Sequence, residues 1–99
     1  MDIHSIPESF QSKIRLAVIA ALVTGDKTFN QIKEVTGATD GNLSVHLTRL
    51  EEMNYIRTVK EFVAKKPRTT YSLTNTGRRE LEEYVDLLEA LLKGAKPDK

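Results

Sequence analysis

Apolar residues recur at steps of three and four along the first part of the chain. Between Pro7 and Val23 they occupy positions 10, 14, 17, 18, 21 and 22. Residues at this spacing fall on one face of a helix, so the pattern predicts a helix over residues 7–23. Ser5 and Glu8 have the spacing of a capping box at its start, and Gly25 is suited to end it.

Two shorter helices are predicted next, each preceded by a residue that can cap it. Thr28 and Gln31 have the spacing of a capping box, and Gly37 ends the helix that follows. Thr39 or Asp40 caps the third helix. The residues expected on the buried sides are Phe29, Ile32 and Val35 in the second helix and Leu43, Leu47, Leu50 and Met53 in the third.

The pattern changes to one typical of strands after residue 55. The stretches IRTVKEFV and TTYSLT are rich in β-branched and aromatic residues, and the basic stretch AKKPR lies between them. These features predict a hairpin over about residues 56–74, with a longer and charged tip. A very short strand is also expected at Lys27–Thr28.

A last helix is predicted over about residues 75–93. Thr74 or Asn75 opens it, and Gly94 and Pro97 end it. Its wide apolar stripe consists of Leu81, Tyr84, Val85, Leu88, Leu91 and Leu92. The predicted fold is therefore a single domain over residues 1–99, mostly α with a β-hairpin, in the order α-α-α-β-β-α.

Composition removes several classes of function. The chain has 99 residues, enough for one modest domain, and no cysteine, so it forms neither disulfides nor thiolate zinc sites. It lacks an apolar run of the roughly 20 residues that a membrane helix needs, so we expect a cytoplasmic protein with no membrane partner. We see no catalytic triad, phosphate loop or metal-ligand cluster, and therefore expect no enzyme, cofactor or metal site.

Charge is distributed unevenly along the chain. Between Arg57 and Arg79 there are seven basic residues and one acid, Glu61, which gives this segment a net charge of +6. Since the whole chain carries +1, the remainder carries −5, and the last helix supplies much of it. Such segregation favours an anionic partner that binds locally.

The second and third predicted helices, joined by the turn TGATDG, have the organisation of a helix-turn-helix over about residues 28–54. In such a unit the second helix lies in the major groove of DNA. With its leucines directed inward, the third helix presents Gly41, Asn42, Val45, Thr48 and Arg49 outward, with Ser44 and His46 at the margins. Asn42 can read adenine, Arg49 can read guanine or hold a phosphate, and Val45 can contact a thymine methyl group.

The hairpin supplies the positive charge. Lys65, Lys66 and Arg68 at its tip are expected to reach along the duplex toward a neighbouring groove or the backbone. Their contacts with phosphates would give an affinity that is independent of sequence and sensitive to salt. Base preference would then come from the helix and positioning from the hairpin.

The order of the elements, together with the runs S-x-H-L-x-x-L-E-x-x-x-Y-I (residues 44–56) and P-R-T-T-Y-x-L-T-x-x-G-R (residues 67–78), resembles the winged helix-turn-helix regulators of bacteria and archaea. The chain is similar to small stand-alone relatives of the MarR and ArsR families. The resemblance implies a homodimeric transcriptional regulator that binds double-stranded DNA, with its terminal helices available for dimerisation. One departure is that ArsR-type metal sensors usually carry Cys or His clusters, whereas this chain has two histidines and no cysteine.

The resemblance also implies roles for individual residues. The DNA-binding residues would be Thr39, Asp40, Gly41, Asn42, Ser44, Val45, His46 and Arg49 in the recognition helix and Lys65, Lys66 and Arg68 in the wing. From the apolar stripes we expect the dimer interface to contain Phe10, Ile14, Leu81, Val85, Leu88, Leu91 and Leu92.

Several alternatives remain open at this stage. His46 is either a DNA contact or a packed residue that fixes the third helix, and Asp40 either caps that helix or accepts from a cytosine. The whole domain is alternatively a protein–protein interaction module without sequence-specific DNA binding. A regulator also needs an input, and a small-molecule effector between the dimer helices and the DNA-binding unit would change the spacing of the two recognition helices. The sequence does not identify such a ligand.

Overall fold

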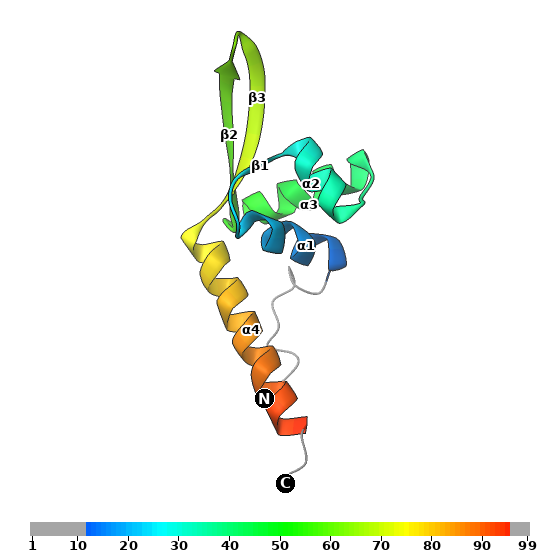
Figure 1. Ribbon diagram of the computed structural model, residues 1–99, viewed down its shortest axis with the longest axis vertical. Coiled ribbons are helices and arrows are strands. Elements are labelled where there is room, and N and C mark those ends of the chain that lie inside the picture. The colour runs from blue at the N-terminus through cyan, green and yellow to red at the C-terminus, as the bar shows by residue number, and fades with distance from the viewer. Residues whose placement is uncertain (1–11, 96–99) are drawn as a thin grey trace.

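The computed structural model describes residues 12–95, which form helices and one antiparallel sheet (Figure 1). The elements are α1 (Lys13–Leu22), β1 (Lys27–Thr28), α2 (Phe29–Thr36), α3 (Asp40–Glu52), β2 (Ile56–Val63), β3 (Lys66–Leu73) and α4 (Asn75–Ala95). This order confirms the predicted mostly helical class with its hairpin, and the two-residue strand at Lys27–Thr28 is present as expected.

Helix α1 begins later than predicted. Ser12 has an extended backbone and caps the helix, because its hydroxyl accepts a hydrogen bond from the Arg15 amide at 3.3 Å. The prediction of an unbroken helix from Pro7 is therefore wrong. The predicted cap at Ser5 and Glu8, and the apolar Phe10, lie outside the described residues.

The capping chemistry of α2 is as predicted, but its buried side is narrower. Thr28 and Gln31 form a reciprocal capping box, and Gly37 ends the helix in the left-handed conformation at φ 71°. Ile32 is fully buried, whereas Val35 is 60% exposed, so the prediction for Val35 is wrong. Each three-residue step falls about 60° short of a full turn, so two such steps from Phe29 rotate Val35 away from the core.

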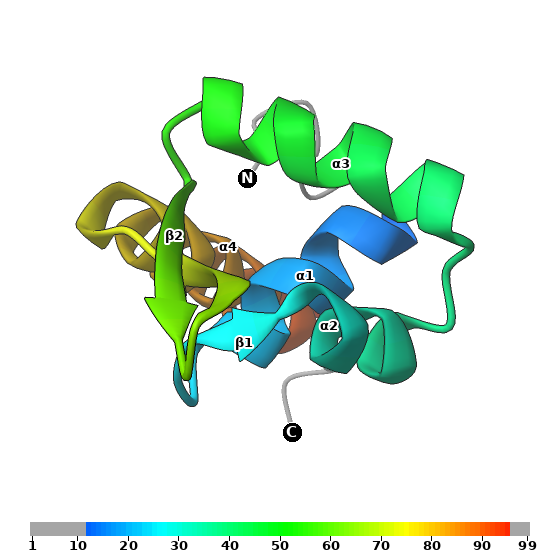
Figure 2. The same cartoon turned by 90° about the horizontal axis from the view of Figure 1, so that it is seen from above.

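The core lies where α1 meets the other helices and the sheet. Helix α1 packs against α2, α3, β3 and α4, and Figure 2 shows α1 lying beside both α2 and α3. The buried apolar residues that form this cluster are Val18, Ile19, Leu22, Ile32, Ala38, Leu43, Leu47, Leu50, Tyr55 and Ile56. Aliphatic side chains dominate this set, as the low aromatic content of the chain requires.

The sheet has the strand order β1-β3-β2, and its hairpin is tighter than predicted. Val63 pairs with Lys66, so the turn contains only Ala64 and Lys65, which have φ 54° and 66°. The expected long tip is wrong, because residues 66–68 belong to β3. Pro67 is tolerated in this strand since β1 pairs only with residues 70 and 71, so β3 has a single neighbour at Pro67.

Helix α4 extends away from the rest of the molecule on the side opposite the hairpin (Figure 1). Its first turn is capped by Thr74, whose Oγ1 accepts from the Gly77 amide at 2.9 Å. The helix continues through Gly94 to Ala95, two residues beyond the predicted range of about 75–93, and Pro97 lies outside the described residues. With the hairpin at one end and α4 at the other, the molecule measures 62 × 25 × 23 Å.

Candidate nucleic-acid interface

The start of α3 is fixed by short-range contacts. The Thr39 hydroxyl accepts a hydrogen bond from the Asn42 amide at 3.2 Å, so Thr39 is the N-cap. Asp40 is the first residue of the helix, and its Oδ1 lies 2.7 Å from Lys33 Nζ of α2. This ion pair spans the turn between the two helices, so Asp40 is already engaged by a cation of the same chain.

The leucines of α3 set the direction of its polar face. Leu43, Leu47 and Leu50 are buried against the core. The residues that remain exposed on α3 include Gly41, Asn42, Ser44, Val45, Thr48 and Arg49. Val45 is 66% exposed, and Arg49 Nη1 lies 3.9 Å from Glu52 Oε1. Because that ion pair is long and solvent-exposed, it contributes little to stability.

His46 has a different setting from its polar neighbours on α3. It is partly buried, and its Nδ1 accepts a hydrogen bond from Arg15 Nε of α1 at 3.1 Å. Burial and the positive charge of Arg15 lower the pKa of His46 below its ordinary value. The neutral imidazole therefore ties α3 to α1, which favours the packed alternative, and a DNA contact by His46 stays a prediction.

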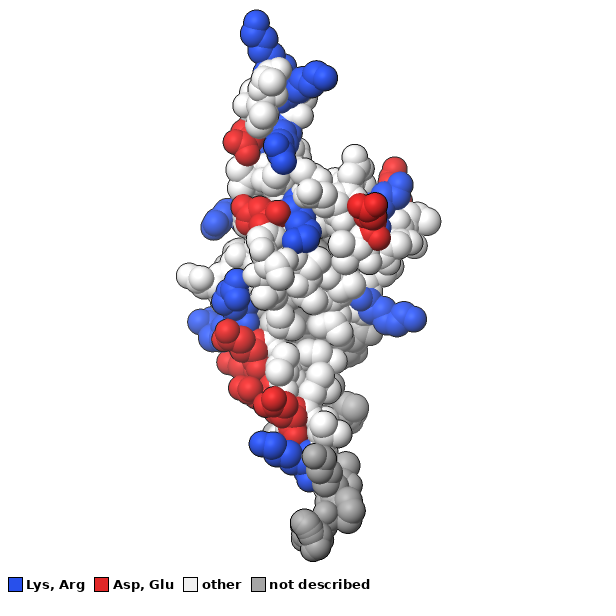
Figure 3. All heavy atoms as spheres, viewed as in Figure 1, with Lys and Arg blue, Asp and Glu red and all other residues white. Residues whose placement is uncertain are grey.

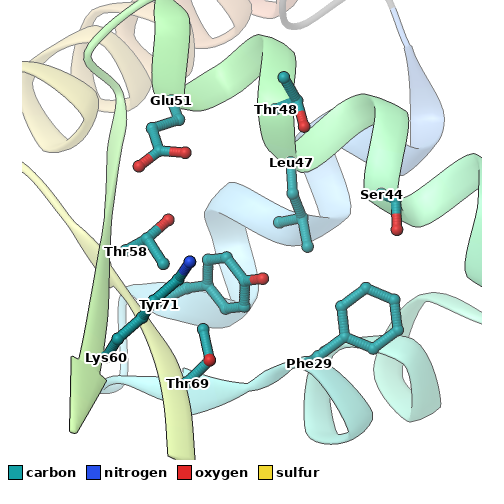
Figure 4. Close-up of a pocket in the computed structure, with 9 residues that line it drawn as sticks. All are labelled: Phe29, Ser44, Leu47, Thr48, Glu51, Thr58, Lys60, Thr69 and Tyr71. Carbon is teal, nitrogen blue, oxygen red and sulfur yellow. The ribbon is translucent and has the colours of Figure 1, made fainter.

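An open cleft of about 710 Å³ separates α3 from the hairpin (Figure 4). Its walls come from α3 on one side and from β2 and β3 on the other, with the N-terminal end of α2 at its edge. The lining residues are Phe29, Ser44, Leu47, Thr48, Glu51, Thr58, Lys60, Thr69 and Tyr71. Both walls thus contribute hydroxyl groups to the cleft. Lys60 adds one ammonium group and Glu51 adds one carboxylate.

Tyr71 projects into this cleft from β3 (Figure 4). Burial, and after it the negative charge of Glu51, raises the pKa of Tyr71 above its ordinary value. The phenol therefore keeps its proton at neutral pH and remains a hydrogen-bond donor. Together with the hydroxyls of Thr48 and Thr69, it gives the cleft several neutral donors suited to an anionic oxygen.

The three predicted wing cations are all exposed, but they do not share one face of the hairpin. Lys65 lies in the turn. Successive side chains of a strand point to opposite faces, so Lys66 and Arg68 project from the face opposite Thr69. None of the three is ion-paired within residues 12–95, and Figure 3 shows basic side chains gathered at this end of the molecule.

The predicted dimer residues of α4 divide into two groups. Leu81 is partly buried and packs against the core, as does Ile14 of α1. Val85 and Leu88 are each 44% exposed and Leu92 is 62% exposed, while Leu91 is partly buried. An apolar strip thus remains uncovered along α4, whereas Phe10 lies outside the described residues.

Two kinds of feature are absent from residues 12–95. No group of three or more His, Asp or Glu side chains is arranged to hold a metal ion in this part of the chain. Within the same range no helix has the length and apolar character needed to cross a bilayer.

Comparison with known proteins decides the family. A family model described as a winged helix DNA-binding domain matches residues 14–92. The chain belongs to the winged helix DNA-binding domain family. In sequence, this winged helix is 35% identical over 77 residues to an uncharacterised protein from Methanocaldococcus jannaschii, a match covering 77% of this chain and 84% of that protein.

Solved structures of regulators have the same fold. A transcriptional regulator homologue from Pyrococcus horikoshii OT3 matches this winged helix with a TM-score of 0.76 and 30% identity, over 91% of this chain and 95% of that one. A protein assigned to the MarR family of transcriptional regulators, from Enterococcus faecalis V583, matches with a TM-score of 0.80 over 96% and 90% of the two chains. At 20% identity, the second match shows likeness of fold alone. The predicted winged helix-turn-helix resemblance is confirmed.

The structure also brings residues to this winged helix surface that the sequence did not single out. Lys60, Thr58 and Tyr71 line the cleft beside Ser44, although they are distant from it in sequence. Alternation along β2 was the one available signal, and the strands did not alternate cleanly enough to assign their faces. The pairing of Lys60 with Thr69 supplies that assignment.

Proposed function

We propose that this winged helix is a non-enzymatic transcriptional regulator that binds double-stranded DNA sequence-specifically as a homodimer. Helix α3 lies in the major groove, where Asn42, Val45 and Arg49 meet base edges. The β2–β3 hairpin lies on the backbone or in the adjacent minor groove. Two copies joined through α4 then read two half-sites about one helical turn, ~34 Å, apart.

One observation carries the proposal: the exposed polar face of α3 and the basic hairpin border the same open cleft. Ser44 and Thr48 line it from α3, and Lys60 and Thr69 line it from the hairpin. Neighbouring major and minor grooves of a duplex are separated by one sugar–phosphate strand. A duplex that receives α3 in one groove and the hairpin in the next therefore passes that strand across the cleft.

The chemistry of the cleft suits a phosphate strand. The hydroxyls of Ser44, Thr48 and Thr69 can donate to phosphate oxygens, and Lys60 adds a charge-assisted donor. Glu51 opposes a phosphate at its end of the cleft, so the strand is expected to cross nearer Lys60. These contacts fix position and orientation, and the outward residues of α3 supply base preference.

The dimer is proposed on the uncovered strip of α4. Val85, Leu88 and Leu92 follow one another at steps of three and four, so they lie on one face of the helix. A two-fold axis through this strip would pack it against the same strip of a second copy. Such packing would bury a contiguous apolar surface that one copy leaves in water.

Selection of bound duplexes from a random library tests the proposal. We expect enrichment of one inverted repeat whose half-sites lie about 10 base pairs apart from centre to centre. Enrichment of a single, asymmetric half-site would contradict the homodimer while leaving DNA recognition in place. No enrichment, together with no shift of random duplex by micromolar protein at low salt, would contradict DNA binding and favour a protein–protein interaction module.

A further inference from the structure

Phe62 is a large apolar side chain that the fold leaves in water. It belongs to β2, lies opposite Pro67 in β3, and is one residue pair away from the Ala64–Lys65 turn. Its exposed fraction is 77%, the highest among the exposed large hydrophobic residues of the described chain. The packing of a single copy therefore gives no reason for an aromatic residue at this position.

The face on which Phe62 projects is set by its neighbours. Thr58 and Lys60 line the cleft between the hairpin and α3, and Phe62 is the next residue of β2 in the same alternation. Figure 1 shows the hairpin extending past α2 and α3. Phe62 is 77% exposed, so no described helix of the same copy covers it. A duplex seated on α3 would therefore have the Phe62 ring directed at it.

The surroundings of Phe62 match a nucleic acid better than an apolar protein groove. Lys65 is in the adjoining turn, whereas Lys66 and Arg68 flank Pro67 on the facing strand and project from the other face of the hairpin. The nearest acid in sequence, Glu61, lies opposite Arg68 in the strand pairing, on the hairpin face away from Phe62. Lys60, two residues before Phe62 on the same face of the hairpin, and Lys65 in the turn place one cation on each side of the ring along the hairpin. Phosphates drawn to these two cations would leave the ring facing the groove between them.

The hairpin tip is also built to hold the ring firmly. Pro67, directly across from Phe62, has a fixed φ and a compact ring. The two-residue turn, with both φ values positive, is a short connection with a defined backbone conformation. A rigid, exposed apolar group next to cations has the properties of the side chains that minor-groove proteins insert between base steps.

We infer that Phe62 is an apolar wedge that enters the minor groove of the bound duplex, partly unstacks one base step and kinks the DNA. The inference rests on the proposed function, because it requires the same duplex to occupy α3 and the hairpin. It adds an activity to that function: this winged helix bends its site. The step that bends most easily, such as TA or CA, would then be preferred where Phe62 enters.

The test uses the duplex most enriched by the full-length protein, with donor and acceptor dyes at its two ends. A second copy of this duplex carries 2-aminopurine at the step nearest the hairpin, as located by hydroxyl-radical footprinting. At saturating protein, the wild type should increase energy transfer between the ends and increase 2-aminopurine fluorescence. Phe62→Ala should bind about tenfold more weakly, in line with the loss of one stacking contact, and its saturated complex should show neither increase.

Two further variants separate a wedge from a general effect on the hairpin. Phe62→Leu keeps a wedge-forming side chain and should retain most of the bend. Val63→Ala removes apolar surface from the next residue on the opposite face and should bend DNA like the wild type. A wild-type complex with a straight duplex, or equal bending by Phe62→Ala, would overturn the wedge and leave the proposed function standing. Failure of the wild type to bind any duplex would overturn both.

Discussion

Gly77 illustrates how a single residue can decide whether two parts of this fold fit together. A Cβ atom built there would fall on the Tyr55 carbonyl oxygen and lie 2.8 Å from Leu73 Cδ1. The same glycine donates its amide to Thr74 Oγ1, which caps α4. A side chain at this position would therefore push the first turn of α4 away from the segment that joins α3 to the hairpin.

Replacing Gly77 by alanine should lower the free energy of unfolding by about 2 kcal/mol, because the clash involves a backbone oxygen that cannot turn aside. Urea unfolding followed by circular dichroism measures the change. Gly41→Ala is the matched control, since a Cβ there meets nothing within 4 Å and alanine favours a helix by about 1 kcal/mol over glycine. Equal stability of Gly77→Ala and the wild type would contradict the close approach.

His46 makes stability depend on pH in a direction that follows from its environment. Burial and Arg15 lower the pKa of His46 in the folded chain, so near this pKa the unfolded chain binds more protons than the folded one. The contribution of His46 to the free energy of unfolding is therefore complete above the pKa of His46 in the unfolded chain, about 6.5. This contribution is lost as the pH falls through the pKa of His46 in the folded chain.

Thermal unfolding of the wild type and of His46→Gln, followed from pH 7.5 to pH 5, tests this linkage. Glutamine keeps a hydrogen-bond acceptor for Arg15 but does not titrate. The wild type should lose more stability on acidification than the variant. Near pH 7.5 the stability of both proteins should change with pH at the same rate. Parallel curves over the whole range would show that His46 titrates alike in the folded and unfolded chains.

At the scale of elements, the sequence predicted what local contacts determine. The capping box of Thr28 and Gln31 and the left-handed Gly37 depend on neighbours within a few residues, and both are present as expected. The predicted start of α1 was wrong. The predicted tip of the hairpin was also wrong, because AKKPR has the composition of a loop and nothing in it reveals that Val63 pairs with Lys66. The strand register is a long-range property, which alternation specifies only weakly here.

The candidate site shows the same division. The outward face of α3 follows from helical periodicity once Leu43 and Leu47 point inward, so it could be predicted from the sequence. The cleft was not, since it requires Lys60 and Tyr71 to lie opposite Ser44. Neither Lys60 nor Phe62 could be assigned to the side facing α3 without the pairing of β2 with β3.

In the proposed complex the hairpin contacts phosphates and α3 contacts bases, so the salt dependence of binding should distinguish the two. If Lys66 and Arg68 each neutralise one phosphate, their double replacement by alanine should reduce the slope of log K against log salt by about 1.8. It should weaken binding to all duplexes alike. Arg49→Ala should instead alter the preference between the selected duplex and its point mutants, by about 1–3 kcal/mol at one position. Titrations at several salt concentrations measure both effects.

Lys93→Ala provides the charge-matched control, because Lys93 lies in the last turn of α4, at the opposite end of the molecule. It should leave both the slope and the preference close to those of the wild type. An unchanged salt slope after loss of both hairpin cations would mean that neither of them contacts phosphate.

At the scale of the whole molecule, charge and shape are both polarised. The hairpin and the helix-turn-helix occupy one end, and acidic residues follow one side of α4 toward the other end (Figure 3). These acids are Glu80, Glu82, Glu83, Asp86 and Glu89. In the proposed complex, repulsion between these acids and phosphates would keep α4 away from the duplex and favour the orientation in which α3 faces it. The α4 end would then point away from DNA, where the proposed dimer requires it to meet a second copy.

The strength of the proposed dimer should depend on the apolar strip of α4 more than on any charge. Burying one leucine side chain contributes about 2 kcal/mol, and a two-fold axis places two copies of Leu88 in the interface. Leu88→Lys should therefore weaken dimerisation by about 4 kcal/mol, a roughly thousandfold rise in Kd. Glu89→Lys introduces the same side chain at the adjacent residue, on the acidic side of α4, and should leave the dimer intact. Sedimentation velocity across a dilution series measures both, and equal Kd values for Leu88→Lys and the wild type would place the dimer contact elsewhere.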